Sequence, residues 1–180
     1  DLVVVLNVGP GSVLNLTGQQ LGLLNGQQAG LRYTSSVPVT MNSIQYRNGD
    51  GDASATATAA ALEYVIGDNY VVPAQAGINY KEQLGIYNPA ATTIQVNIQI
   101  LFFDGATATE TVTIAADDFE FVAVDQFQSV LSRTGPAAFS LVVSASTPIV
   151  VGFTHYDLNF NGGWGTLAAP IGLTNALSSI

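Results

Sequence analysis

Two glycine-containing stretches carry the side chains best suited to binding a metal ion. Oxygen-bearing residues stand at alternate positions in each, at Asn48, Asp50 and Asp52 in the first and at Asp157, Asn159 and Asn161 in the second. Ca²⁺ takes about six to eight oxygen ligands, and glycines let a loop bend so that several oxygens point inward. Both stretches are therefore candidate structural Ca²⁺ sites. The alternative is a pair of solvated hairpin loops, because Asn, Asp and Gly are also common turn residues.

An aromatic side chain follows the second of these stretches. Trp164 lies between Gly163 and Gly165. An indole ring has a large apolar face and one N–H donor, which suits it to stacking against a sugar ring. We therefore treat Trp164 as a candidate carbohydrate-binding residue. The alternative is that its ring packs over one end of the fold.

Catalytic residues are scarce in this chain. His155 is the single histidine, and its strand-like surroundings predict a structural or half-exposed role. Cysteine and a Gly-x-Ser-x-Gly segment are both absent, which removes the usual zinc sites and the usual serine-nucleophile turn. Asp117, Asp118 and Glu120 alternate around Phe119, as in a turn followed by a solvated strand face; a glycosidase carboxylate pair is the alternative. We predict that the chain is not an enzyme.

The chain carries few charges, and most of them are acidic. Its 180 residues include 4 Lys+Arg and 13 Asp+Glu, which gives a net charge of -9, and only 9% of residues are charged. An acidic chain repels the phosphates of nucleic acid and an anionic membrane surface, so this charge balance argues against both as partners. A surface of Thr, Ser, Asn, Gln and Gly indicates an extracellular or cell-surface location. Weak repulsion between copies also favours self-association.

The strongest structural pattern lies at Ile94–Phe103. Apolar and polar residues alternate there, which is the period of a strand with one buried face. Asp104-Gly105 follows and is typical of a tight hairpin turn. Helical patterns are weak throughout, and no apolar run approaches the roughly 20 residues of a membrane-spanning helix. We therefore predict an all-β, antiparallel fold without a membrane span.

A repeat relates the two ends of the chain. Leu31–Val39 resembles Leu141–Ile149, which lies 110 residues further on. The spacing shifts to 108 further upstream, so residues 1–61 correspond to about 108–170, the second half of a module, and residues 62–170 form a complete module. A half module cannot close its own core. Either it packs onto the rest of the chain, or a neighbouring copy supplies the missing strands.

Two apolar stretches suit such an exchange between copies. One lies in the first eight residues, and the other is the tail at 171–180. The candidate assembly residues are Leu2, Val3, Val4, Val5, Leu6, Ile171, Leu173 and Leu177. The alternative is that both stretches are edge strands of their own subunit.

The order of short motifs in the second part of the chain resembles a known family. Leu84–Pro89 ends in Asn-Pro, the alternating strand at Ile94–Phe103 follows, and Ser144–Tyr156 contains a Thr-Pro-Ile segment. This order is similar to that of the β-sandwich modules repeated in large exported bacterial and archaeal surface proteins. The resemblance covers 62–170 in full and 12–60 in part. It implies an immunoglobulin-like β-sandwich and an architectural or adhesive role, with no catalytic residues.

These observations favour a structural function. We expect a self-assembling subunit or segment of an extracellular filament, surface layer or appendage, joined through strand edges, so that its partner is another copy. The second hypothesis is a cell-surface binding or adhesion module. It would recognise carbohydrate or a protein through end loops at residues 47–52 and 157–164.

Overall fold

The computed structural model describes residues 3–24, 34–37, 44–47, 50–54, 61–71, 80–134, 137–157 and 162–170. The chain divides into two compact units, Asp1–Thr34 and Ser35–Ile180. The division into a half module, a complete module and a tail was predicted at other boundaries, and it remains a prediction.

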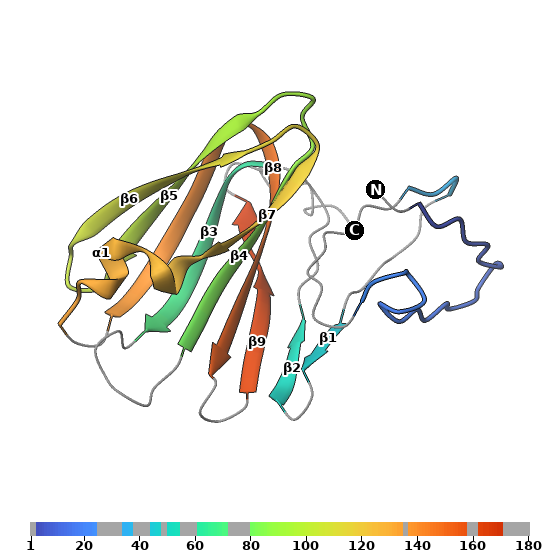
Figure 1. Ribbon diagram of the computed structural model, residues 1–180, viewed down its shortest axis with the longest axis horizontal. Coiled ribbons are helices and arrows are strands. Elements are labelled where there is room, and N and C mark those ends of the chain that lie inside the picture. Colours follow the sequence, from blue (N-terminus) through green and yellow to red (C-terminus); the bar gives the residue numbers. More distant parts are fainter. Residues whose placement is uncertain are drawn as a thin grey trace, which may run out of the picture. The chain divides into compact units, whose positions relative to one another are not determined.

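The described residues of the larger unit lie mostly in strands (Figure 1). They are β1 Ile44–Arg47, β2 Asp50–Ser54, β3 Ala61–Val71, β4 Tyr80–Asn88, β5 Ile94–Phe102, β6 Thr107–Ile114, β7 Asp118–Ala123, β8 Ala137–Asp157, β9 Gly162–Leu167 and β10 Ala169–Pro170. Two short helical turns, η1 Val124–Gln126 and α1 Gln128–Leu131, follow β7. Every strand pair is antiparallel, which confirms the predicted all-β class. No helix in the described part of the chain is long and apolar enough to cross a membrane.

Strand β8 holds the sheet together because its two ends belong to different ladders. Its first part lies between β3 and β5, and its last part lies between β4 and β9. Pro148 falls within the register shift of the β3 ladder, between Ser144 and Ile149, where a residue without an amide hydrogen interrupts no strand pairing. The sequence predicts two strands here, Ala138–Ser144 and Ile149–Tyr156. The structure corrects this to one continuous strand.

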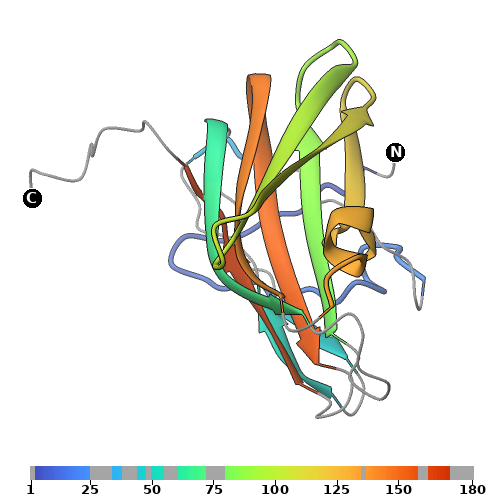
Figure 2. The same ribbon diagram turned by 90° about the vertical axis from the view of Figure 1, so that its left-hand side faces the viewer.

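The sheet curls into a half-barrel whose inner side holds the core (Figure 2). Strand β5 shows why, since its apolar residues are buried and the polar residues between them are exposed, as the alternation predicts. Core residues from the other strands include Leu84, Ile86, Ile114, Val122, Phe139, Leu141, Val143, Ile149, Val151 and Phe153. Burial of apolar surface, at roughly 25 cal/mol per Å², is the main force that holds the curl.

Asn88 fixes the connection between β4 and β5. The side chain is fully buried, and its Nδ2 donates to the carbonyl oxygens of Thr92 at 2.9 Å and Ala115 at 2.7 Å. Its Oδ1 accepts the amide hydrogen of Ala90 at 3.0 Å. One amide group therefore ties the turn after Pro89 to the chain that leaves β6, which gives the Asn-Pro motif a structural reason.

The turn between β5 and β6 is the hairpin that the Asp-Gly pair predicts. Gly105 has a φ of 90°, a conformation that other residues adopt at a cost. Asp104 accepts the amide hydrogen of Ala106 at 3.0 Å and forms an ion pair with Arg133. The guanidinium of Arg133 also lies 4.2 Å from the centroid of the Phe102 ring. The amide of Ala106, and then the guanidinium, lower the pKa of Asp104, although desolvation opposes them.

This lowered pKa predicts a loss of stability in acid. A carboxyl whose folded pKa is below its unfolded pKa stabilises the fold above the unfolded value, and the contribution disappears as pH falls through the folded value. We expect stability to fall below about pH 4, and Asp104→Asn to remove part of that fall. Urea unfolding at neutral and acidic pH measures it. Glu120→Gln, which removes one exposed charge elsewhere, is the control, and an equal effect of both substitutions would contradict the prediction.

Candidate functional site

Asp50 and Asp52 lie in a strand and not in a bent loop. β1 and β2 form a hairpin in which Asp50 pairs with Arg47 and Asp52 pairs with Tyr46. The polar loop predicted at residues 47–52 is therefore shorter than expected, because Arg47, Asp50 and Asp52 are already paired in the hairpin. Asn48 lies outside the described residues.

The second candidate Ca²⁺ stretch begins at the end of β8. Asp157 pairs with Tyr80 on one side and with Gly162 on the other. Asn159 and Asn161 fall outside the residues that the structure describes. Within those residues, no group of three or more Asp, Glu or His side chains gathers where it could hold a metal ion. The Ca²⁺ hypothesis stays a prediction, because half of its proposed ligands lie beyond the described ranges.

The backbone brings the two candidate stretches toward each other. Trp164 lies in β9, directly opposite His155 of β8. Strand β2, which contains Asp50 and Asp52, runs beside β9 (Figure 1). Two hairpins that are far apart in the sequence therefore lie side by side in the larger unit. Carbohydrate binding by Trp164 remains a prediction.

The apolar segment Val3–Val8 of the smaller unit is exposed to solvent. Val3 and Val5 expose 82% and 86% of their surface, and Val4 and Leu6 expose 42% and 43%. None of the residues 3–24 belongs to a helix or strand, although the sequence predicts a strand over residues 2–8. The difference arises because no described strand pairs with this segment. The remaining candidate assembly residues, Leu2, Ile171, Leu173 and Leu177, lie outside the described residues.

The curled sheet has open edges that such a segment could join. Among the described strands, β6 pairs with β5 alone and β7 pairs with β4 alone. An open edge presents a row of backbone N–H and C=O groups that can pair with another chain. An exposed apolar segment of strand length and an open edge are the two components of a strand-addition interface.

A buried polar cluster that sequence reasoning missed lies at one end of β4. Glu82 is fully buried, and its Oε1 lies 2.6 Å from Nδ1 of His155. The amide of Glu82 donates to Oδ1 of Asp125 at 3.1 Å, and Nε2 of Gln126 donates to the other carboxylate oxygen at 2.5 Å. These contacts join β4, β8 and η1, which indicates that the cluster fixes how the three elements meet.

The strand period contained a signal for this cluster. Glu82, Leu84 and Ile86 have the same parity, and the last two are apolar, so Glu82 falls on the buried face of its strand. A carboxylate on a buried face needs a polar or charged partner. The period alone could not reveal that His155, in another strand, lies directly opposite.

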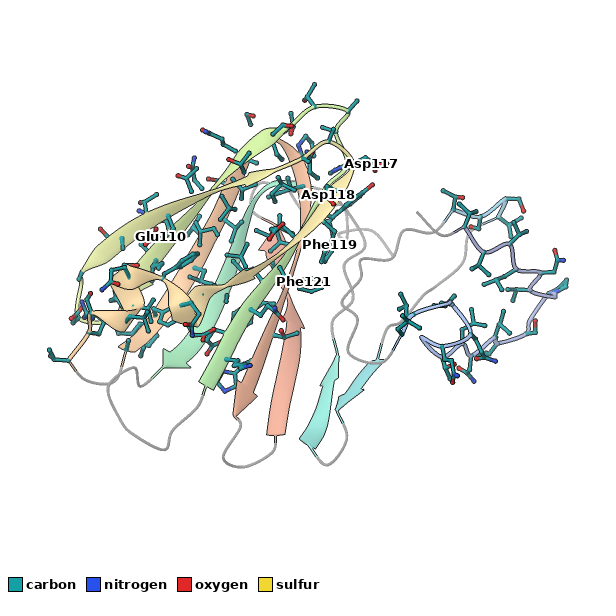
Figure 3. The ribbon with its side chains drawn as sticks, in the orientation of Figure 1. Glu110, Asp117, Asp118, Phe119 and Phe121 are labelled. Atoms are coloured by element: carbon teal, nitrogen blue, oxygen red, sulfur yellow. The ribbon has the colours of Figure 1, made fainter. Side chains whose placement is uncertain are left out.

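Two phenylalanines lie together on the outer face of β7 (Figure 3). The rings of Phe119 and Phe121 meet edge to face, with their centroids 4.8 Å apart. They lean over Gly85 of β4, where an added Cβ would lie 2.9 Å from Cζ of Phe119. Tyr87, which pairs with Phe119 in the ladder, donates its hydroxyl hydrogen to the carboxylate of Asp117, the residue just before β7. The side chains of β7 therefore reach across β4 and depend on the absence of a side chain at Gly85.

Gly85→Ala is expected to destabilise the fold by about 1–3 kcal/mol, because the new methyl group must displace the Phe119 ring. Phe119→Leu should recover part of this loss when it is combined with Gly85→Ala. Denaturant unfolding of the two single variants and the double variant gives their coupling energy. Strictly additive effects would show that the ring does not limit the space at Gly85.

Comparisons with known proteins identify a structure with a similar fold but do not assign the chain to a family. No protein-family model and no curated protein matches this chain. The crystal structure of Thermotoga maritima 1070 is similar, with a TM-score of 0.53 and 19% identity, over 61% of this chain and 94% of that one. The Anabaena sensory rhodopsin transducer aligns with a TM-score of 0.45 and 21% identity, over 52% of this chain and 86% of that one. At 19% identity, the likeness to the Thermotoga protein shows a shared fold alone.

Proposed function

We propose that this chain is an extracellular structural protein that self-assembles by strand addition, as a subunit or segment of a filament, surface layer or appendage. The observation that carries the proposal is the exposed segment Val3–Val8, which no described strand pairs. Five of its six residues are apolar. A segment of this kind gains most by joining a sheet edge of another copy.

The free energy of such a contact comes from two sources. Each backbone hydrogen bond contributes about 1 kcal/mol net, and each buried Val or Leu side chain contributes about 1.5–3 kcal/mol. A six-residue segment can make several of each. Their sum exceeds the lower part of the roughly 4–15 kcal/mol that association costs in lost freedom of motion.

The finer architecture belongs to the same proposal. An immunoglobulin-like β-sandwich is compatible with a curled antiparallel sheet in which β8 serves two ladders. The low proportion of charged residues supports an extracellular setting.

Deleting residues 1–8 tests the proposal. The intact chain should form large assemblies, and the truncated chain should sediment as a monomer in analytical ultracentrifugation. Circular dichroism must show the same β-sheet content in both, so that unfolding is not mistaken for loss of assembly. A truncated chain that still polymerises would show that this segment is not the donor.

A second candidate function rests on the two neighbouring hairpins. Because β2 runs beside β9, the hairpin that contains Asp50 and Asp52 lies next to the strand that contains Trp164. We propose carbohydrate or protein binding there as the alternative function. A glycan array probed with the intact chain and with Trp164→Ala measures sugar binding, and an empty array would remove the carbohydrate form of this proposal.

A further inference from the structure

We propose that the edge of β6 is the docking site for Val3–Val8 of a second copy, an inference that rests on the proposed self-assembly. Soluble proteins usually protect their edge strands with lysines, prolines, bulges or short lengths. β6 has eight residues and contains neither lysine nor proline. Its ladder with β5 continues through eight consecutive pairs, from Leu101 opposite Thr107 to Ile94 opposite Ile114, without a register shift. Such an edge is a regular template for another strand.

The other edges are each protected. β7 carries the exposed carboxylates of Asp118 and Glu120. β3 has two register shifts, and β10 covers it at Tyr64 and Val65. β9 has three glycines among six residues and lies beside β2. β1 and β2 have only four and five residues.

Charge separates β6 from β7 as a partner for this donor. Val3–Val8 carries no charge, so docking on β7 would bring apolar side chains against exposed carboxylates. The single charged residue of β6 is Glu110, and its Oε1 accepts a hydrogen bond from the Ser129 hydroxyl at 2.9 Å (Figure 3). That carboxylate is already held by α1. Docking an uncharged strand at β6 therefore buries fewer exposed carboxylates than docking it at β7 would.

The two faces of β6 also match the two faces of the donor. Ala108 and Val112 lie on the inner face on either side of Glu110, are only partly buried and pack against the core, so an added strand would bury them further. The donor side chains of even number, Val4, Leu6 and Val8, are all apolar and suit this inner face. Those of odd number, Val3, Val5 and Asn7, then lie on the outer face, in line with the exposed row Thr107, Thr109, Thr111 and Thr113.

Disulfide cross-linking in the full chain tests this site, because the chain has no cysteine of its own. Val5→Cys protein is mixed with Thr107→Cys, Thr109→Cys, Thr111→Cys or Thr113→Cys protein and oxidised mildly. The matched control is Ala123→Cys on β7, which is also an exposed edge position. Mixed disulfides are identified by mass spectrometry, and light scattering of the same samples records assembly. Paired strands bring facing residues within the range that a disulfide spans.

We expect a mixed disulfide at one or two neighbouring threonine positions and none at Ala123→Cys. Assembly that proceeds without a threonine cross-link, or with a cross-link to Ala123→Cys, would overturn the β6 site and leave the proposed function standing. Absence of both assembly and cross-links would overturn both. In a Val5→Cys/Thr111→Cys double variant, a disulfide that closes within one dilute chain would show that the segment docks on its own β6, which also contradicts the proposal.

Discussion

Val4→Lys combined with Leu6→Lys is expected to abolish assembly. Both side chains point toward the core of the neighbouring copy when the segment joins β6, next to Ala108 and Val112. Burial of each contributes about 1.5–3 kcal/mol, and a lysine in its place would have to lose water from its charge. We expect association to weaken at least about 100-fold, since every 1.4 kcal/mol is a factor of ten. Sedimentation velocity over a concentration series measures this change.

The matched control places the same two charges on the other face of the segment. Val3→Lys combined with Val5→Lys faces outward beside the threonine row of β6, where a lysine keeps its water. We expect this pair to weaken association by less than about tenfold, or about 1.4 kcal/mol. If both pairs abolish assembly equally, the segment does not bind as a strand with one buried face.

His155→Leu is expected to cause the largest loss of stability in the chain. Oε1 of Glu82 lies 2.6 Å from the imidazole, and Glu82 is fully buried. Removing one partner of a buried pair leaves the other buried without it, which costs about 3–5 kcal/mol. Urea unfolding followed by tryptophan fluorescence and by circular dichroism measures the free energy of unfolding.

The double variant separates this cause from lost packing. Replacing both partners, as Glu82→Met with His155→Leu, removes the buried carboxylate as well as the imidazole. Apolar replacement of a whole buried pair is often neutral or stabilising, so the double variant should be more stable than His155→Leu alone. If the double variant is less stable than the single one, packing of the imidazole and not its pairing with Glu82 explains the loss.

The sequence predicted local features of the fold that depend on neighbouring residues. The alternation at Ile94–Phe102 identified a half-buried strand, and Asp104-Gly105 identified its turn, because both follow from strand period and backbone conformation. The strand path through residues 144–149 was not predicted correctly. A Pro148 between two strand-like segments indicates a break, whereas the structure continues one strand past it, since no ladder partner is required at that position.

Features that depend on distant partners could not be predicted in the same way. The valines at positions 3–5 favour a strand by composition, but a strand forms only where another strand supplies its hydrogen bonds. Glu82 falls on a buried face by parity, yet its partner His155 becomes visible only from the register of β4 with β8. The proximity of β2 to β9 is likewise a property of the folded sheet.

Electron microscopy of the intact, purified chain over a range of concentrations tests self-assembly most directly. We predict ordered filaments or sheets that appear above a threshold concentration and disappear on dilution. Dispersed particles of monomer size at every concentration would contradict the account, and the neighbouring hairpins at β2 and β9 would then become the leading functional surface.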